Sequence, residues 1–417
     1  MSRESKKGSG YPVRQSNRFI LVLFACLGTM SACASAANEP HLSVLEVRHY
    51  RIHTDLEKSL AEDLGRRMDA MYEDYSRRLA DFNPVHKTKF EVYLFARRDD
   101  YLRFTQNKVP NTGGVFMPSR RTLAAFLEGQ GRDTLRRTLQ HEAFHQFAHR
   151  AIHPELPPWL NEGLASVFEE GIFLGRTFSL GQVPPRRVRQ LHADIEAKRL
   201  IPFETFMRYS LKDWSVALSD DSNRGATQYN QAWAMCHFLI YAGPAGEPTY
   251  RRRLLDLLNR LHKGQNSHQA FEQAFSPNIL GFQKHFYQFA RAMKPTAQAS
   301  MIERQEILAD MLVALNGRGE RFDSVAEFRR AMARNGYRMS YTKGDLTWQT
   351  SSDSDTYFQN LDGTRLTDDE LRFEWRTGAP LPDLVLRAPG QIRLRTRFHH
   401  ADPGKVEHEV LISEPAR

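Results

Sequence analysis

Cysteine is scarce in this chain, which has only three among its 417 residues. Cys26 and Cys33 lie near the N-terminus, so Cys236 stands alone in the rest of the sequence. This excludes a framework of disulfide bonds within the chain as the source of its stability. Because Cys236 falls in an apolar stretch with helical periodicity, we expect a buried core residue rather than a reactive thiol.

Long apolar runs are also missing. The most apolar segment, Phe19 to Met30, has about twelve residues, whereas a helix that spans a bilayer needs ~20. Small residues follow this segment, and five basic residues precede it: Arg3, Lys6, Lys7, Arg14 and Arg18. This order is typical of a secretory signal. We therefore expect residues 1–36 to be a signal peptide or lipoprotein signal, and the mature protein to reach the periplasm or the outer membrane.

Two cleavage sites compete in this segment. Met30-Ser31-Ala32-Cys33 is similar to a lipoprotein signal, although methionine stands where leucine is usual, and it makes Cys33 a candidate lipid anchor. Ala34-Ser35-Ala36 offers an A-x-A site, which would release a soluble protein beginning at Ala37. Both alternatives remain open, and both place the mature protein outside the cytoplasm.

A strongly basic surface is not expected, despite a formal net charge of +9. Residues 1–33 hold five basic residues and one acidic residue, so their removal leaves a mild +5. The other basic residues are scattered in pairs among acids, without a patch interleaved with aromatics. Nucleic acid is therefore not an expected partner.

The periodicity predicts strands first and helices afterwards. Alternating or extended patterns occupy residues 42–53, 90–94, 113–117 and 122–127, and helical spacing occupies 60–79, 99–106 and 134–152. From Pro158 to about Ala333 nearly everything has a helical pattern. We expect an α+β domain over residues 40–335.

The C-terminal residues 336–417 have a different pattern, with period-two alternation between clusters of Gly, Pro and Asp. We expect a small β-rich appendage. Within it, Arg393, Arg395 and Arg397 would share one face of a strand, and a solvated face is the simplest interpretation.

One arrangement of histidine and glutamate carries chemical meaning, the H-E-x-x-H pattern of His141-Glu142-Ala143-Phe144-His145. Residues four apart lie on one face of a helix, so His141 and His145 can present two imidazoles to one metal ion. Glu142 lies beside them, placed to take a proton from a water molecule that the metal activates.

A catalytic zinc site needs a third protein ligand and one open position. The segment Trp159-Leu160-Asn161-Glu162-Gly163-Leu164-Ala165-Ser166 supplies a candidate in Glu162, which follows His145 after sixteen intervening residues. A helix that begins near Pro158 would run back along the first helix and could bring Glu162 to the two histidines. The residues therefore predict a metal group of His141, His145 and Glu162.

H-E-x-x-H-Q followed by W-L-N-E-G-x-A-S resembles the zinc signature of gluzincin aminopeptidases of the aminopeptidase N type. It is still more similar to bacterial peptidase-MA-like domains, and the resemblance extends over about residues 88–245. The resemblance implies a gluzincin, zincin-like fold with a small mixed sheet before the metal helix and a helical lobe after it. It also implies Zn²⁺ held by His141, His145 and Glu162, with Glu142 as general base.

Two further comparisons with zinc peptidases refine this hypothesis. Metzincins would need glycine and histidine where this chain has Ala148 and Ala151, so His149 and His153 are expected on a polar face rather than as ligands. By resemblance, Tyr229 would hydrogen-bond the developing oxyanion, although packing within the core is an equal alternative. The motif with which aminopeptidases bind a substrate amine is missing around residues 113–117, which removes the support for aminopeptidase activity.

The sequence thus predicts an exported zinc metallopeptidase that acts on a peptide or protein substrate. One alternative is a zinc hydrolase that cleaves another kind of bond, because the ligand set activates water without specifying the substrate. The other is an envelope binding or assembly protein with a vestigial or structural metal site. The intact Glu142 argues against this second alternative, since a structural site has no need of a base.

Overall fold

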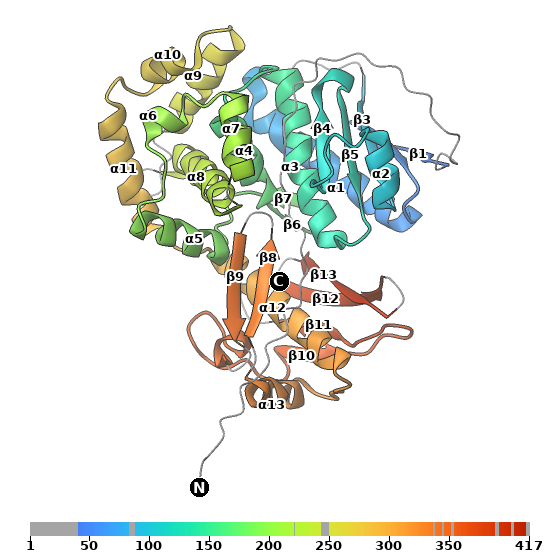
Figure 1. Ribbon diagram of the computed structural model, residues 1–417. Helices are drawn as coiled ribbons and strands as arrows, with labels where there is room; N and C mark the ends of the chain where they lie inside the picture. Colours follow the sequence, from blue (N-terminus) through green and yellow to red (C-terminus); the bar gives the residue numbers. More distant parts are fainter. Residues whose placement is uncertain are drawn as a thin grey trace. The chain divides into compact units, whose positions relative to one another are not determined.

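The computed structural model describes residues 41–82, 88–220, 222–242, 250–336, 338–343, 346–351, 354–387, 392–401 and 404–413. The signal expected over residues 1–36, including Cys33, lies outside the described residues. The chain forms two compact units, which divide between Ala299 and Ser300. Helices and strands occur in both units, and the fold class is α+β as expected (Figure 1).

The first unit contains a five-stranded mixed sheet with the order β1-β2-β3-β5-β4. Its strands are β1 (Ser43–Glu46), β2 (Tyr50–Thr54), β3 (Phe90–Phe95), β4 (Gly114–Met117) and β5 (Thr122–Phe126). Strands β2, β3 and β5 are parallel, and β1 and β4 run antiparallel at the two edges. The small mixed sheet expected before the metal helix is therefore present.

The single strand expected over residues 42–53 is instead a hairpin of β1 and β2. The turn is closed by a hydrogen bond from the backbone N–H of Val47 to the carbonyl of Tyr50. Asp69 of the following helix accepts the N–H groups of Arg48 and His49, both at 2.9 Å. The loose alternation did not reveal this turn, because its capping group comes from a residue some twenty positions further on.

Helices cover both faces of the sheet. Helices α1 (Lys58–Arg78) and α3 (Arg132–Ala151) pack together and against the strands, and they share the main hydrophobic core with Leu123 of β5. The short helix α2 (Arg98–Phe104) packs with Phe126 in a separate core cluster. All five residues of β5 are buried, which explains its unbroken apolar pattern.

A helical lobe follows α3, as expected. Its helices are α4 (Pro158–Glu169), α5 (Pro185–Glu196), α6 (Phe203–Phe206), α7 (Leu211–Asp220), α8 (Ser222–Tyr241), α9 (Arg251–His262), α10 (Ser267–Ala274) and α11 (Ile279–Ala292).

One hairpin, β6 (Ile172–Leu174) with β7 (Thr177–Ser179), interrupts the helical pattern and was not predicted. Gly175 adopts φ +61° in its two-residue turn, a backbone conformation that suits glycine.

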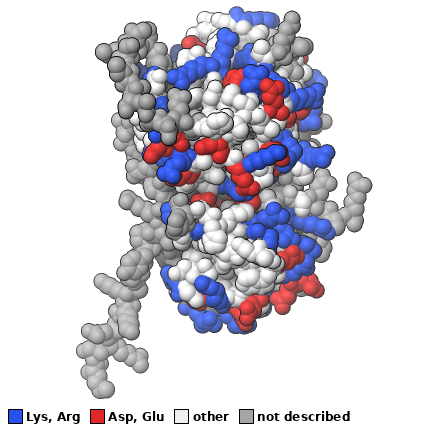
Figure 2. Space-filling view, turned by 90° about the vertical axis from the view of Figure 1, so that its right-hand side faces the viewer, with Lys and Arg blue, Asp and Glu red and all other residues white. Residues whose placement is uncertain are grey.

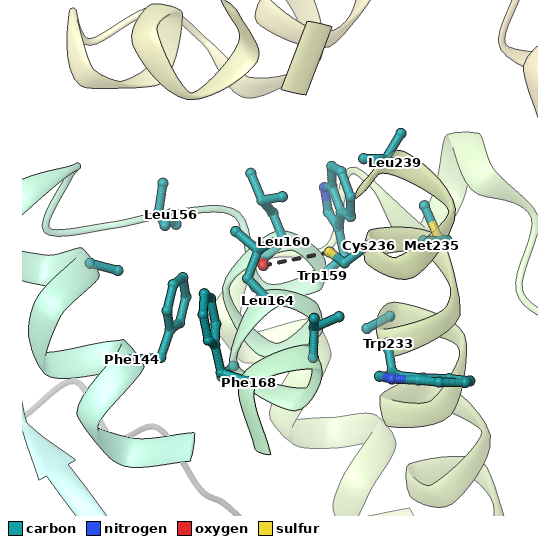
Figure 3. Close-up of a cluster of buried hydrophobic side chains, with 14 of the residues drawn as sticks. Phe144, Leu156, Trp159, Leu160, Leu164, Phe168, Trp233, Met235, Cys236 and Leu239 are labelled. Carbon is teal, nitrogen blue, oxygen red and sulfur yellow. Dashed lines mark hydrogen bonds between the residues drawn. The ribbon is translucent and has the colours of Figure 1, made fainter. Parts of the chain in front are cut away.

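Helices α4 and α8 approach each other unusually closely at Gly163. A Cβ atom there would lie 2.4 Å from the carbonyl oxygen of Ala232 and 2.5 Å from Cys236 Sγ. Figure 3 shows the apolar side chains of α4 between those of α3 and α8, with the Cys236 thiol directed to the Leu160 carbonyl. Cys236 is a buried core residue, as expected, and burial raises the pKa of its thiol. The close contact fixes the position of α4 at Gly163, which directly follows Glu162.

The described residues of the second unit form two sheets. Strands β8 (Arg338–Lys343) and β9 (Leu346–Ser351) form a hairpin. An antiparallel sheet of four strands follows, formed by β10 (Leu371–Glu374), β11 (Asp383–Leu386), β12 (Arg393–His400) and β13 (Val406–Ser413). On β12, Arg395 donates to Asp383 and Glu374, so the row that it shares with Arg393 and Arg397 is partly engaged in ion pairs.

Helices α12 (Ala297–Gly317) and α13 (Val325–Asn335) bring residues ahead of position 336 into this unit. Gln305 of α12 donates to the Leu384 carbonyl at 2.8 Å, and Phe328 of α13 packs on Phe373 of β10. The unit therefore begins earlier than the expected boundary after residue 335.

Charges of both signs are mixed on one face of the molecule. On the face drawn in Figure 2, Lys and Arg side chains lie interspersed with Asp and Glu. A search of the described residues finds no helix with the length and apolar character that crossing a membrane requires.

Candidate metal centre

Helix α3 carries the first three residues of the site. It is buried on most sides between the sheet and α4, and His141, Glu142 and His145 are all nearly inaccessible to solvent. The imidazole rings of His141 and His145 lie edge to face with their centroids 4.8 Å apart. This is the geometry that the spacing of four residues predicts for one face of a helix.

Helix α4 brings Glu162 to the two histidines. Pro157 and Pro158 precede and begin this helix, where a missing backbone N–H has no cost. Glu162 Oε2 lies 3.3 Å from His141 Nε2 and 3.6 Å from His145 Nε2. One ligand atom from each of the three residues lies within 4.8 Å of the other two, so this buried group could hold a metal ion.

The far side of each imidazole is fixed by a polar partner. His141 Nδ1 lies 3.3 Å from Glu169 Oε2, and His145 Nδ1 lies 3.1 Å from Asn161 Oδ1. An Nδ1–H that donates to such an oxygen leaves Nε2 with its lone pair directed toward Glu162. Second partners of this kind orient histidine ligands in many metal sites.

The electrostatics of the group demand a positive charge at its centre. Burial alone would raise the pKa of Glu162, but the neighbouring His145 and His141 lower it to about 2. Burial likewise opposes a charged His141, yet hydrogen bonds to Glu162 and Glu169 raise its pKa to about 10. A proton on His141 or a metal cation can supply the positive charge that the ionised carboxylates require.

Three arginines hold the carboxylates of Glu169 and Glu170 next to His141: the partly buried Arg137 and the buried Arg186 and Arg187. Arg137 donates to Glu169 at 2.9 Å and to Glu170 at 3.1 Å. Arg186 and Arg187 donate to Glu170 at 2.5 and 2.6 Å. Against the effect of burial, the hydrogen bond to His141 and the nearby Arg137 and Arg187 lower the pKa of Glu169 to about 2. Glu169 therefore remains ionised and anchored while it orients His141.

Glu142 points away from this carboxylate network. Its Oε2 accepts the backbone N–H of Phe116 on β4 at 2.7 Å, while its buried Oε1 has no hydrogen-bond partner among the described residues. Burial raises the pKa of Glu142, and the nearby histidines only partly oppose this effect. One oxygen is thus fixed, and the other can exchange a proton with a bound molecule.

A pocket that opens to solvent reaches the site. Glu142 and His145 lie among its lining residues, together with Val115, Phe116, Pro118, His149, His153, Pro154, Leu156 and Asn161. His149 and His153 therefore belong to the pocket wall, as expected for polar-face residues, and do not join the metal group.

Residues 136–244 match a family model described as a protein of unknown function, DUF1570. No curated protein matches the chain. The match begins within α3 and ends after α8, so it contains His141, Glu142, His145, Glu162 and Tyr229. The whole five-stranded sheet and the whole second unit lie outside the match. The matched family has no known function from which a role could be transferred.

Tyr229 is buried on α8, with its ring edge-on to Trp214 at a centroid distance of 5.2 Å. It is not among the residues that line the pocket. Its suggested contact with an oxyanion therefore stays a prediction, beside an evident packing role.

Three contacts of the site were not identified from the sequence: Glu169, Asn161 and the backbone N–H of Phe116. Glu169 follows Glu162 by seven residues, which places both on one face of α4, so helical spacing could have revealed it. Asn161 lies inside the W-L-N-E-G-x-A-S signature, next to Glu162, but the signature does not indicate its contact with His145. Phe116 depends on the approach of a separate element, and no sequence signal marks it.

Proposed function

We propose that this chain is a zinc-dependent peptidase of the gluzincin type. His141, His145 and Glu162 would hold the metal, and Glu142 would act as general base. The observation that carries this proposal is the position of Glu142, with one oxygen fixed and the other unpartnered, in the wall of a pocket that also reaches His145. A purely structural metal site gives no reason to keep such a carboxylate.

The separations between Glu162 and the two histidines suit zinc. Ligand atoms about 2.0–2.1 Å from a tetrahedral zinc ion are about 3.3 Å from one another. The separations from Glu162 Oε2 to His141 Nε2 and His145 Nε2 are 3.3 and 3.6 Å. Two histidines and one glutamate also form a ligand set of known catalytic zinc sites, which leave one position for water or substrate.

Glu142 has the properties of a base that works on a buried water molecule. Its pKa is raised toward neutral pH, and a group whose pKa lies closer to neutral pH can both accept and return a proton. The Phe116 N–H holds Oε2, so Oε1 is the oxygen that would accept the proton and pass it to the leaving amine. When bound, zinc would supply Lewis acidity, which activates the water and polarises the scissile carbonyl.

The edge of the sheet supports a peptide as the substrate. Strand β4 pairs only with β5 in its sheet, and the N–H of Phe116 points away from β5 toward Glu142. In an antiparallel pair, residues alternate between bonding to the partner strand and facing outward. The outward groups of β4 could pair with an extended peptide beside the metal group, as in other cases where a strand is added to a sheet edge.

The test is to measure metal content and peptide hydrolysis in the parent, Glu142→Gln and His145→Ala. The parent should hold about one zinc per chain, and His145→Ala should lose most of it. Glu142→Gln should keep its zinc while the rate falls ~10²–10⁴-fold, because glutamine cannot accept the proton. The exposed Glu196→Gln is the matched control and should behave like the parent.

Two outcomes would overturn the proposal. Stoichiometric zinc that persists in both His141→Ala and His145→Ala would remove the metal assignment. Parent-like hydrolysis by Glu142→Gln would remove the general base. A parent that holds zinc but cleaves other bonds and no peptide would favour the wider class of zinc hydrolases.

We also propose that the chain is exported, from the basic start, the short apolar run and the two small-residue cleavage sites. Mass spectrometry of envelope protein should find a mature N-terminus either at a lipid-modified Cys33 or at Ala37. An intact Met1 in the cytoplasmic fraction would contradict both forms.

A further inference from the structure

We infer that the site cleaves internal bonds of an extended polypeptide, which continues beyond the metal group into a second pocket. This inference rests on the proposed peptidase function. It adds that the cleaved bond is internal and that the bound substrate continues into the second pocket.

The second pocket lies beside the first. It is lined by His153, Glu155, Leu156, Pro157, Leu261, Gly264, Gln265 and Ser267. His153 and Leu156 line both pockets, so the two form one groove with these residues at the junction. The groove runs from Glu142 and His145, across the loop between α3 and α4, to the turn between α9 and α10.

The walls of this groove are held in place by local contacts. The ring of His153 accepts the backbone N–H of Glu155 at 3.0 Å, and Pro154 and Pro157 restrict the same loop. His262 at the end of α9 donates to the Ile152 carbonyl, which ties the second wall to the loop. A groove built this way is largely formed before a substrate binds, which lowers the entropy cost of ordering it.

The two pockets differ in chemistry. The first offers Val115, Phe116, Pro118 and Leu156, and suits an apolar side chain next to the metal group. The second offers the polar groups of Gln265 and Ser267 and the exposed carboxylate of Glu155. We therefore expect a polar or basic substrate side chain in the second pocket.

The first pocket has no free group suited to hold the end of a peptide beside the metal group, and the carboxylate of Glu155 belongs to the second pocket. Glu142 is the single carboxylate among the residues that line the first pocket, and the proposed reaction already uses it. No lysine or arginine lines either pocket, so a terminal carboxylate has no cationic partner there among the described residues. An exopeptidase needs one of these features, whereas an endopeptidase needs only a continuous groove.

The test compares two internally quenched fluorescent peptides. One is long and blocked at both ends, and the other is short and fills only the first pocket. The zinc-loaded parent should cleave the long peptide internally, and faster when lysine rather than glutamate occupies the position of the second pocket. Gln265→Trp narrows the second pocket, and the ratio of long- to short-peptide kcat/KM should fall roughly tenfold or more. Lys263→Trp, on the same turn but outside the groove, should keep the parent ratio.

Ser267→Phe narrows the same pocket from its other wall and serves if Gln265→Trp fails to fold. Melting curves and zinc content verify that both variants are intact. Release of single residues from free termini, with blocked peptides left uncut, would overturn this inference and leave the proposed peptidase standing. An unchanged ratio in both narrowed variants would also overturn it. Absence of all peptide hydrolysis by the zinc-loaded parent would overturn both proposals.

Discussion

Glu169 determines how His141 faces the metal group. Its carboxylate lies 3.3 Å from His141 Nδ1 and is held in turn by Arg137 at 2.9 Å. Glu169→Gln keeps the shape of the side chain but removes the negative charge that strengthens the imidazole as a ligand. We expect zinc affinity to fall ~10–100-fold, as is usual for loss of such a partner. Competition with a chromophoric chelator measures this change.

The matched control for this prediction is a glutamate–histidine pair remote from the metal group. Glu73 Oε1 lies 2.9 Å from His49 Nε2 on the surface of the first unit. Glu73→Gln removes the same kind of interaction, and zinc affinity should stay at the parent value. Equal affinities in Glu169→Gln and Glu73→Gln would show that the charge of Glu169 does not support His141.

The sequence predicted His141, His145 and Glu162 at the site because each has a required chemical type at a required spacing. The structure brings these three residues together. Phe116 could not be predicted in the same way, because it contributes a backbone N–H, which every residue except proline has. Its role depends on the packing of β4 against α3, and a single sequence does not encode that as a residue type.

The close packing of α4 on α8 provides a prediction at the scale of helices. A methyl group at Gly163 would lie 2.4 Å from the Ala232 carbonyl oxygen, so Gly163→Ala must push the two helices apart. Overpacking of this kind costs roughly 1–3 kcal/mol of unfolding free energy. Because Glu162 is the adjacent residue, zinc affinity should fall as well. Denaturant unfolding and zinc titration measure the two effects.

A second glycine supplies the control. Gly317 ends α12, and a Cβ atom there would meet nothing within 4 Å. Gly317→Ala should therefore leave the stability unchanged or raise it by up to about 1 kcal/mol, since alanine loses less chain entropy in a helix. If Gly163→Ala is as stable as the parent and binds zinc equally well, the close contact does not position Glu162.

Elements with strong periodicity were predicted well, and short hairpins were not. The helix expected over residues 134–152 corresponds to α3, because its start and end are marked by Gly131 and the proline-rich loop. The hairpin β6–β7 was missed, since strands of three residues are too short for alternation to stand out from a helical pattern.

At the scale of the whole molecule, the boundary between the units shows what periodicity cannot supply. Helices α12 and α13 have the same kind of pattern as the lobe before them, so the sequence grouped them with it. Their partners are strands further along the chain, as the bond between Gln305 and the Leu384 carbonyl illustrates. Long-range contacts define a compact unit, and local spacing does not report them.

The metal group should make the unfolding free energy of the molecule depend on pH, and bound zinc should reduce the loss at alkaline pH. In the metal-free protein the pKa of His141 is raised from its ordinary 6.5 to about 10. The stability that charged His141 contributes is therefore fully present below pH 6.5 and is lost as the pH rises toward 10. The pKa of Glu162 is lowered from 4.5 to about 2, so its contribution is lost as the pH falls through that range.

Zinc binding requires an unprotonated His141, so binding near pH 7.5 should release about one proton from this residue. Calorimetry in buffers of different ionisation enthalpy measures that proton. The zinc-saturated protein should lose less unfolding free energy than the metal-free protein between pH 7 and 10, because the cation replaces the proton between the carboxylates. His141→Asn lacks the titrating group, and its metal-free form should show a smaller alkaline loss than the parent. Identical pH profiles for parent and His141→Asn would mean that the charge on His141 does not stabilise the metal-free fold.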